Sequence, residues 1–281
     1  MFSFEDAAIY ASSFFVFFIR GKSSTFAVIH LELLKIKIMK LHILAIGVHP
    51  DDVELGCSGT LINHIRKGQQ VGILDLTQGE LGSRGSIQSR FEEAHHSAEV
   101  MKIPVRENLK MRDGFFKNDE AHQIEIIRFL RRFQPDIVLA NARQDRHPDH
   151  GRAGKLIADA CFLSGLRKIE TKWKGHNQTA WRPKRVFHYI QDRLIPPDFI
   201  VDISASFSQK LEAIKCFKTQ FFSDASEGPE TYISKPGFLD KIIYRAALLG
   251  QRIGVEYGEG FTCTSETGIA DLDQLIYPEM P

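Results

Sequence analysis

The sequence has almost no excess charge, few cysteines and no cysteine pair, and each absence excludes a class of protein. Its 36 Lys and Arg residues nearly balance 35 Asp and Glu residues, so the net charge of +1 gives no reason to expect nucleic-acid binding. The 4 cysteines include no CxxC pair, which argues against a disulfide framework and against a cysteine zinc site. We therefore expect reduced thiols and a cytoplasmic protein.

A long apolar segment that could cross a membrane is also missing. Residues 7–19 (AAIYASSFFVFFI) are mostly apolar but too short to span a bilayer comfortably. Glu5 and Asp6 precede them in place of a basic segment, and no small-residue cleavage signal follows, so a secretory signal peptide fits poorly. We expect no membrane association, although an interfacial anchor is the alternative.

The clean strand pattern begins only at Met39. Our hypothesis is that Met39 is the natural start of the protein and that residues 1–38 are an upstream extension that packs poorly. Residues 39–281 would then form the whole functional domain. We find no internal repeat, low-complexity tract or linker in that range, so we expect one domain rather than two.

From residue 39 onward, short apolar runs alternate with longer amphipathic stretches. This alternation favours a parallel sheet covered by helices on both faces. We predict an α/β fold, Rossmann-like and doubly wound, with a mainly parallel sheet, and we expect residues 172–181 to form a loop. The expected strands are 41–48, 70–78, 136–142, 185–191 and 199–204, and the expected helices are 55–69, 88–103, 119–134, 151–166, 207–221 and 237–254.

Two motifs rich in histidine and aspartate follow strands of this expected sheet. GVHPDDVELG (47–56) comes at the end of the first strand, and NARQDRHPDH (141–150) comes at the end of a later one. In open parallel sheets, ligands bind beyond the carboxyl ends of the strands, near the point where the strand order reverses. The two motifs are therefore expected to meet in one crevice.

Together these motifs supply the ligand types of a metal site. A catalytic zinc site uses about three nitrogen or oxygen ligands and keeps one position open for water. His49 and Asp52 lie three residues apart at the start of a helical segment and can point the same way, and a histidine of the second motif completes the set. Asp51, next to a ligand, would face the water as a general base.

Each motif also has a purely structural interpretation. Asp51 and Asp52 could only cap the following helix, because Asp favours that position. HPDH could likewise be no more than a helix start, with Pro148 in the first turn and Asp149 aiding the helix dipole. Because both motifs follow the carboxyl ends of strands, we favour the metal site.

A third loop, TQGELGSRG (77–85), follows the second expected strand. Its glycines allow a close approach of the backbone, and Arg84 could reach the crevice and bind a carboxylate with two parallel hydrogen bonds. The alternative is a surface loop with a solvated arginine. We favour a functional loop, because loops at this edge of a sheet commonly carry sites.

HPDD at 49–52 and HPDH at 147–150 resemble the motifs of the LmbE-like (PIG-L-type) family of zinc-dependent N-acetylglucosamine deacetylases. More narrowly, GELGSRG (79–85), HYIQDR (188–193) and GVEYGEGF (254–261) resemble segments of bacillithiol-pathway deacetylases, which act on N-acetylglucosaminyl malate. The resemblance runs from about Met39 to about Leu275. It implies a hydrolase that removes an acetyl group, and a homo-oligomer such as a hexamer.

The resemblance also assigns roles to the two aspartate-histidine motifs. It implies that the metal ligands are His49, Asp52 and His150 and that Asp51 is the general base. Zinc is the implied metal, although two histidines and one aspartate accept other divalent ions.

Further roles follow from the same resemblance. His147 matches a histidine that assists at the scissile amide, and Asp149 matches its orienting partner. Arg84 matches an arginine that lines the substrate pocket. Asp113 in RDGFF is expected to bind sugar hydroxyls, and Tyr232 is our candidate for a tyrosine of the oxyanion hole.

The expected partner is a small-molecule sugar conjugate. A malate conjugate carries two carboxylates, and Arg84, Arg143 and Arg146 lie on or beside the crevice loops. Three alternatives stay open at this stage: a deacetylase of another N-acetylglucosaminyl conjugate, a metal-binding protein without catalysis, and a receiver-like signalling domain. The receiver domain is the weakest, because such domains are much shorter and do not need HPDH.

Overall fold

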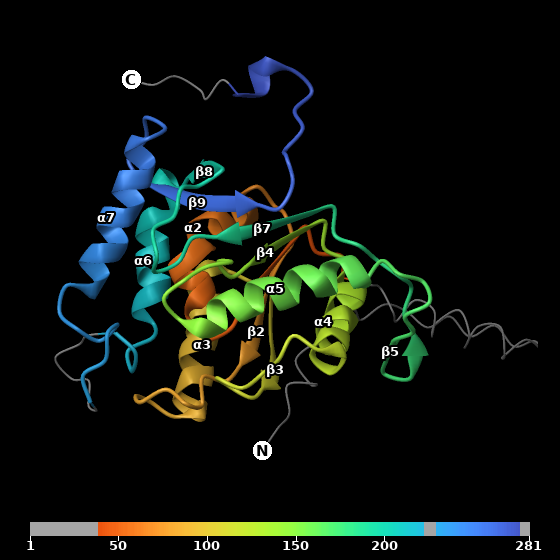
Figure 1. The fold of residues 1–281 in the computed structure, drawn as a ribbon. Coiled ribbons are helices and arrows are strands. Elements are labelled where there is room, and N and C mark those ends of the chain that lie inside the picture. Colours follow the sequence, from red (N-terminus) through yellow and green to blue (C-terminus); the bar gives the residue numbers. More distant parts are fainter. Residues whose placement is uncertain (1–38, 222–228, 276–281) are drawn as a thin grey trace, which may run out of the picture. The chain divides into compact units, whose positions relative to one another are not determined.

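The computed structural model describes residues 39–221 and 229–275. The start-site hypothesis for residues 1–38 concerns residues outside these ranges. Within them, a seven-stranded sheet has the order β3-β2-β1-β4-β7-β9-β8 (Figure 1). Its strands are β1 Ile43–Gly47, β2 Val71–Thr77, β3 Val105–Met111, β4 Ile137–Ala140, β7 Arg185–Tyr189, β8 Phe199–Asp202 and β9 Gly258–Cys263.

Most neighbouring strands run parallel. The pairs from β3 to β7 are parallel, whereas β9 is antiparallel to both β7 and β8. The predicted α/β fold with a mainly parallel, doubly wound sheet is therefore confirmed. After β1 the chain adds β2 and β3 on one side and then returns to place β4 on the other side. The strand order therefore reverses between β1 and β4, where such folds bind ligands.

Helices cover both faces of this sheet (Figure 1). Strand residues alternate between the two faces, as in Leu44 and Ile46 on one and Ile43 and Ala45 on the other. No helix of the described ranges is long and apolar enough to cross a membrane. The helices are α2 Asp52–Arg66, α3 Ile87–Met101, α4 Glu120–Phe133, α5 Pro148–Leu163, α6 Phe207–Lys215 and α7 Phe238–Gln251.

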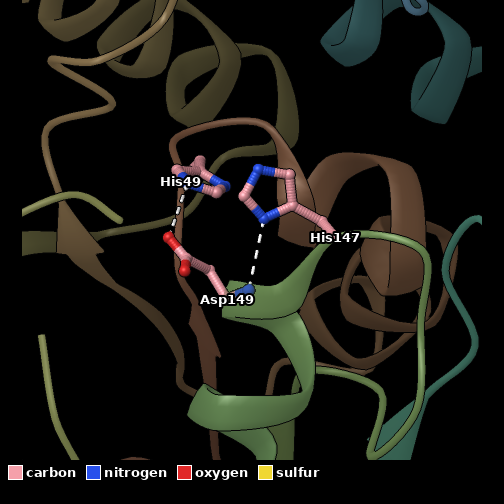
Figure 2. A group of neighbouring side chains, drawn as sticks. All are labelled: His49, His147 and Asp149. Carbon is pink, nitrogen blue, oxygen red and sulfur yellow. Dashed lines mark hydrogen bonds and ion pairs between the residues drawn. The ribbon is translucent and has the colours of Figure 1, made fainter. Parts of the chain in front are cut away.

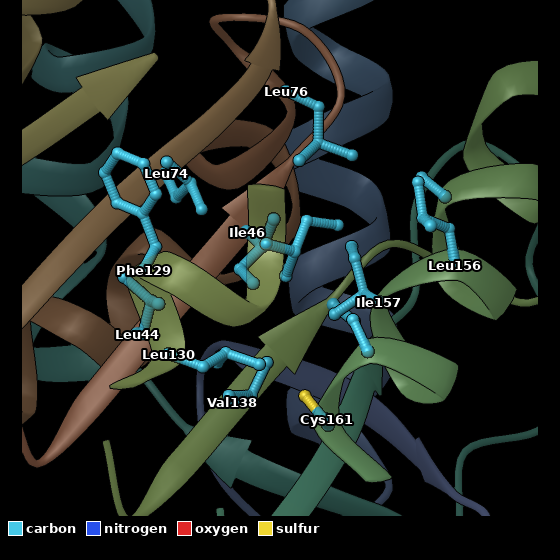
Figure 3. Close-up of a cluster of buried hydrophobic side chains, with 14 of the residues drawn as sticks. Leu44, Ile46, Leu74, Leu76, Phe129, Leu130, Val138, Leu156, Ile157 and Cys161 are labelled. Atoms are coloured by element: carbon cyan, nitrogen blue, oxygen red, sulfur yellow. The ribbon is translucent and has the colours of Figure 1, made fainter. Parts of the chain in front are cut away.

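One apolar cluster packs α4 and α5 against the sheet (Figure 3). In it, Leu74 of β2 and Val138 of β4, the strands on either side of β1, pack with Leu130 of α4 and Ile157 of α5, and all four are fully buried. A second cluster packs α2 and α3 against the opposite face, where Leu61 is fully buried. These two layers fix the carboxyl ends of β1 and β4 and hence the loops that follow them.

Three regions differ from the sequence-based expectation. β3 was not expected, because its sequence VRENLKM is polar, as an edge strand that is only half-buried allows. β9 was not expected either, because two glycines interrupt GEGFTC. Residues 172–181 contain a short antiparallel pair, β5 Lys172–Trp173 and β6 His176–Asn177, in place of a plain loop.

A buried ion pair ties α2 to the antiparallel edge of the sheet. Lys210 Nζ lies 2.7 Å from Glu259 Oε1, and the two side chains are only 2% and 4% exposed. Lys210 also donates to the carbonyls of Glu54 and Leu55, while Glu259 accepts from backbone amides in the middle of α2. Such a pair is tolerated inside a protein because its remaining hydrogen bonds are satisfied.

Replacing Glu259 by Gln should destabilise the protein strongly. The variant leaves the Lys210 ammonium buried without a counter-charge, which typically costs about 3–5 kcal/mol. The measurement is urea unfolding of the variant beside Glu256→Gln, an exposed glutamate three residues away, which should change stability by less than about 0.5 kcal/mol. Equal stabilities for the two variants would contradict the role of Glu259 as the counter-charge of Lys210.

Candidate metal centre

Both aspartate-histidine motifs lie at the carboxyl ends of their strands and line one cavity. The first forms the turn between β1 and α2, and the second leads from β4 into α5. The cavity wall includes all six motif residues considered in the sequence analysis: His49, Asp51, Asp52, His147, Asp149 and His150. Residues about a hundred positions apart in the chain therefore meet at the reversal point of the sheet.

Asp52 is the most firmly held side chain of the cavity. Its Oδ2 accepts hydrogen bonds of 3.0 Å from the backbone amides of Val48 and His49 and from Asn141 Nδ2. Its Oδ1 accepts from Gln191 Nε2, also at 3.0 Å. These donors come from the β1 turn, from the end of β4 and from the loop after β7, so three segments of the chain fix one carboxylate.

His150 faces Asp52 from the first turn of α5. Its Nε2 lies 3.1 Å from Asp52 Oδ1, and its Nδ1 bonds Asp145 Oδ2 at 2.5 Å. Burial alone would lower the pKa of His150, but Asp52 and Asp145 outweigh it and raise that pKa to about 10. Burial alone would raise the pKa of Asp52, but His150 and its other partners hold it well below its usual range. Asp52 is therefore an anion at neutral pH.

His49 faces Asp52 with its other ring nitrogen. Its Nδ1 lies 3.7 Å from Asp52 Oδ2, and its Nε2 lies 3.0 Å from Asp113 Oδ1. Burial would lower the pKa of His49, but the hydrogen bond to Asp113 and the charge of Asp52 give a net increase. Asp113 also accepts from the backbone amide of Leu81. The carboxylate expected to bind sugar hydroxyls thus contacts a histidine in the structure.

The donor set of these three residues fits a divalent metal ion. One ligand atom each from His49, Asp52 and His150 lies within 4.8 Å of the others. Each histidine uses one nitrogen to bond a carboxylate, which leaves the second nitrogen directed toward Asp52. This carboxylate–histidine arrangement is typical of zinc sites, where it fixes the tautomer and the ring orientation of the ligand.

Two residues of this arrangement were not found from the sequence. Asp145 bonds and orients His150. The sequence feature that could have indicated this role is an acidic residue in the same loop, five residues before the histidine. Arg90 of α3 lines the cavity, and its Nη2 donates to the Pro50 carbonyl and lies 3.6 Å from Asp51. No pattern in the sequence distinguished Arg90 from other surface arginines of an amphipathic helix.

Asp51 is held in an unusual conformation beside the metal group. Its φ of 139° is rare for a residue with a side chain and costs about 1–3 kcal/mol. Its side chain makes no capping hydrogen bond to α2, so helix capping does not explain it. Burial raises its pKa to about 7, although Arg90 lowers it. A carboxylate with this pKa can take up a proton near neutral pH.

His147 and Asp149 occupy the start of α5 (Figure 2). His147 is the N-cap, and its Nδ1 accepts from the backbone amide of Asp149 at 3.3 Å. Asp149 therefore contacts the His147 ring through its backbone, whereas its carboxylate accepts from the Gly114 amide and from Arg152. Burial and the neighbouring imidazoles lower the pKa of His147, so the ring is neutral at neutral pH.

The structure does not bring Arg84 to the cavity. Arg84 Nε donates to the carbonyl of Thr219, and its Nη1 donates to the carbonyl of Pro229. These bonds hold the guanidinium on backbone carbonyls, and neither Arg84 nor Arg143 is among the described residues that line the cavity. The arginines that do line it are Arg90, Arg146 and Arg245.

Comparisons with known proteins place the chain among deacetylases. Residues 44–161 match the family model "PIG-L: GlcNAc-PI de-N-acetylase". The diacetylchitobiose deacetylase of Thermococcus kodakarensis is 28% identical and covers 78% of this chain and 81% of its own length. The uncharacterized deacetylase YaiS of Escherichia coli is 30% identical over 42% of this chain and 67% of its own length. A probable N-acetyl-alpha-D-glucosaminyl L-malate deacetylase 2 of Bacillus anthracis is 21% identical, over 68% of this chain and 86% of its own length.

Solved structures share the fold. The conserved protein TT1542 from Thermus thermophilus is 32% identical, with a TM-score of 0.73, and covers 82% of this chain and 97% of its own length. GalB from Pseudomonas putida, a hydratase, is 20% identical with a TM-score of 0.67 over 83% of this chain and 100% of its own, so the fold alone does not define the reaction. The sequence matches do define it: the chain belongs to the PIG-L family of deacetylases and is an enzyme that hydrolyses an N-acetyl amide.

Asp145→Asn should weaken divalent-metal binding while the protein stays folded. An amide accepts the Nδ1 proton of His150 less strongly than a carboxylate, and losing such a partner typically lowers metal affinity about 10- to 100-fold. The measurement is a titration of metal-free protein with zinc in competition with a chromophoric chelator.

Asp119→Asn is a matched control for this variant. Asp119 forms a similar carboxylate–histidine pair with His122, at 2.6 Å, on the exposed start of α4. Its replacement should leave zinc affinity unchanged. The same affinity for Asp145→Asn and the wild type would show that Asp145 does not support a metal ligand.

Proposed function

We propose that the protein is a zinc-dependent deacetylase that acts on an N-acetylglucosaminyl conjugate, with N-acetylglucosaminyl malate of bacillithiol biosynthesis as the substrate. The observation that carries the proposal is the grouping of His49, Asp52 and His150 beside the buried carboxylate of Asp51. A metal-binding protein without catalysis would have no use for a second, strained carboxylate at this position.

The three ligand residues would hold the ion, and Asp51 would handle the proton. When bound, a divalent ion supplies a Lewis acid that polarises the acetyl carbonyl and lowers the pKa of water. Asp51 accepts a proton from the water that attacks the carbonyl carbon, and its raised pKa suits a base at neutral pH. The nearby Arg90 guanidinium keeps this carboxylate in place.

His147 would act on the other side of the scissile bond. Its Nδ1 accepts from the backbone amide of Asp149, so a neutral ring carries its proton on Nε2. This nitrogen can donate to the acetyl oxygen as negative charge develops there, or to the amine as the carbon–nitrogen bond breaks. The products are acetate and a free amine on the sugar.

Arg146 supports an acidic conjugate as the substrate. Its Nε donates to Asp192 at 2.7 Å, and its guanidinium lies 4.3 Å from the centre of the Tyr232 ring. Within the described ranges its two Nη groups have no hydrogen-bond partner, and the side chain is half exposed at the cavity. A fixed guanidinium with free donors suits a carboxylate of the conjugated group.

Diacetylchitobiose is the second candidate substrate. The Thermococcus relative that carries this name is more similar to the chain than the Bacillus relative named for the malate conjugate. Diacetylchitobiose is neutral and would offer no carboxylate to the two Nη groups of Arg146. The homo-oligomer and the cytoplasmic location expected from the sequence stay predictions.

Asp51→Asn should remove most of the activity and leave the metal bound. Asn cannot accept the proton of water, and positioned acid–base groups typically contribute about 10² to 10⁴ in rate. The measurements are acetate release and zinc content of the same sample. Asp136→Asn, at the amino end of β4 and away from the cavity, is the control and should keep normal turnover. Loss of zinc from Asp51→Asn would mean that Asp51 is a ligand.

Arg146→Gln should change substrate selectivity. Loss of a charged hydrogen bond typically costs about 1.5–3 kcal/mol, so kcat/KM for N-acetylglucosaminyl malate should fall about 10- to 100-fold. The same constant for diacetylchitobiose should hardly change, and Arg143→Gln, outside the cavity lining, should affect neither. An equal loss with both substrates would assign Arg146 to the shared sugar or to the structure of the cavity.

A further inference from the structure

A second group of ligand residues adjoins the first. One ligand atom each from His49, His147 and Asp149 lies within 4.8 Å of the others (Figure 2), as is also true of the group around Asp52. The two groups share His49. The cavity therefore offers two positions for a cation on opposite edges of one imidazole ring.

The two edges of His49 face different carboxylates. Its Nδ1 lies 3.7 Å from Asp52 Oδ2, whereas its Nε2 lies 3.8 Å from Asp149 Oδ2 and 3.0 Å from Asp113 Oδ1. The Nε2 edge thus meets two carboxylates that are only 1% and 4% exposed. The ring of His147 stands nearly perpendicular to that of His49, with 5.1 Å between the ring centres.

The carboxylates around Nε2 of His49 favour a cation. Around the Nε2 edge, the charged partner of Asp149 is Arg152, which bonds only one carboxylate oxygen, Oδ1. The other oxygen, Oδ2, accepts the Gly114 amide and faces His49. Imidazole nitrogen and carboxylate oxygen are the donor types that zinc binds.

We propose that His147, Asp149 and Nε2 of His49 form a second, weaker zinc site that inhibits the enzyme when it is filled. Filling it replaces the hydrogen bond between His49 Nε2 and Asp113 by a bond to the ion, and the displaced Nε2 proton goes to solvent. An ion at the group around Asp52 would leave the outer hydrogen bonds of His49 and His150 in place, so this group fills first.

The inhibition follows from the position of His147. An ion bound to this ring and to Asp149 would tie up His147 and withdraw it from the scissile amide. This step rests on the proposed function, whereas the existence of the second site does not. Deacetylation should accordingly rise with the first equivalent of zinc and fall as further zinc is added.

The test counts ions on the full-length protein. Metal-free wild-type protein is titrated with zinc, and bound zinc is measured by calorimetry and by elemental analysis after equilibrium dialysis. We expect about two zinc ions per chain, one for each group of ligands. His147→Asn and Asp149→Asn should each bind only the first, with its affinity retained. Asn can cap α5 in place of His147, so the first variant keeps the helix start.

The control and the kinetic arm separate the outcomes. His122→Asn removes a partly buried histidine outside the cavity that also bonds an aspartate, and it should bind as many ions as the wild type. A single ion on the wild type, or a second ion that persists in both cavity variants, would overturn the second site. A second ion that leaves turnover unchanged would overturn the inhibition. Absence of deacetylation with only the first ion bound would instead count against the proposed function.

Discussion

The buried carboxylate of Asp52 is the constraint on which the rest of the site depends. An ionised carboxylate inside a protein is tolerated only when its oxygens are hydrogen-bonded or paired with charge. Here the donors are two backbone amides of the β1 turn and the side-chain amides of Asn141 and Gln191. The carboxylate therefore holds together the ends of β1, β4 and β7, and it faces His49 after β1 and His150 after β4.

The same carboxylate explains why the cavity favours a cation. Asp51 and Asp52 are adjacent in the chain and both buried, and Asp113 and Asp145 bond His49 and His150 nearby. Negative charges gathered in a buried cavity repel one another unless positive charge offsets them. Protons on the histidines offset part of this charge, and a divalent ion would offset more, because His49, Asp52 and His150 could hold it while the bonds to Asp113 and Asp145 stay in place.

The parts of this arrangement that could be predicted from sequence are those written in local patterns. Alternating apolar runs and amphipathic helices gave the sheet, and the position of HPDD and HPDH after strands gave the crevice. Asp145 and Arg90 could not be found this way, because their roles depend on contacts made only after folding. For Arg84 the local pattern was misleading. It lies in a glycine-rich loop after β2, as a substrate-binding arginine could, but in the folded protein it donates to backbone carbonyls outside the cavity.

The last third of the chain completes a site whose motifs all lie before it. The match to the family model covers only residues 44–161. Gln191, which lies after β7 and outside this match, nevertheless donates a hydrogen bond to Asp52. Arg245 of α7 donates to the carbonyls of Gln191 and Leu55 and so joins that loop to α2, the helix that Asp52 begins. Lys210 of α6 and Glu259 of β9, which form an ion pair, both hydrogen-bond to the backbone of the same helix. Because α2 and the β7 loop must hold one carboxylate jointly, the antiparallel edge of the sheet is part of the metal centre's support, and changes there should reach the site through Asp52.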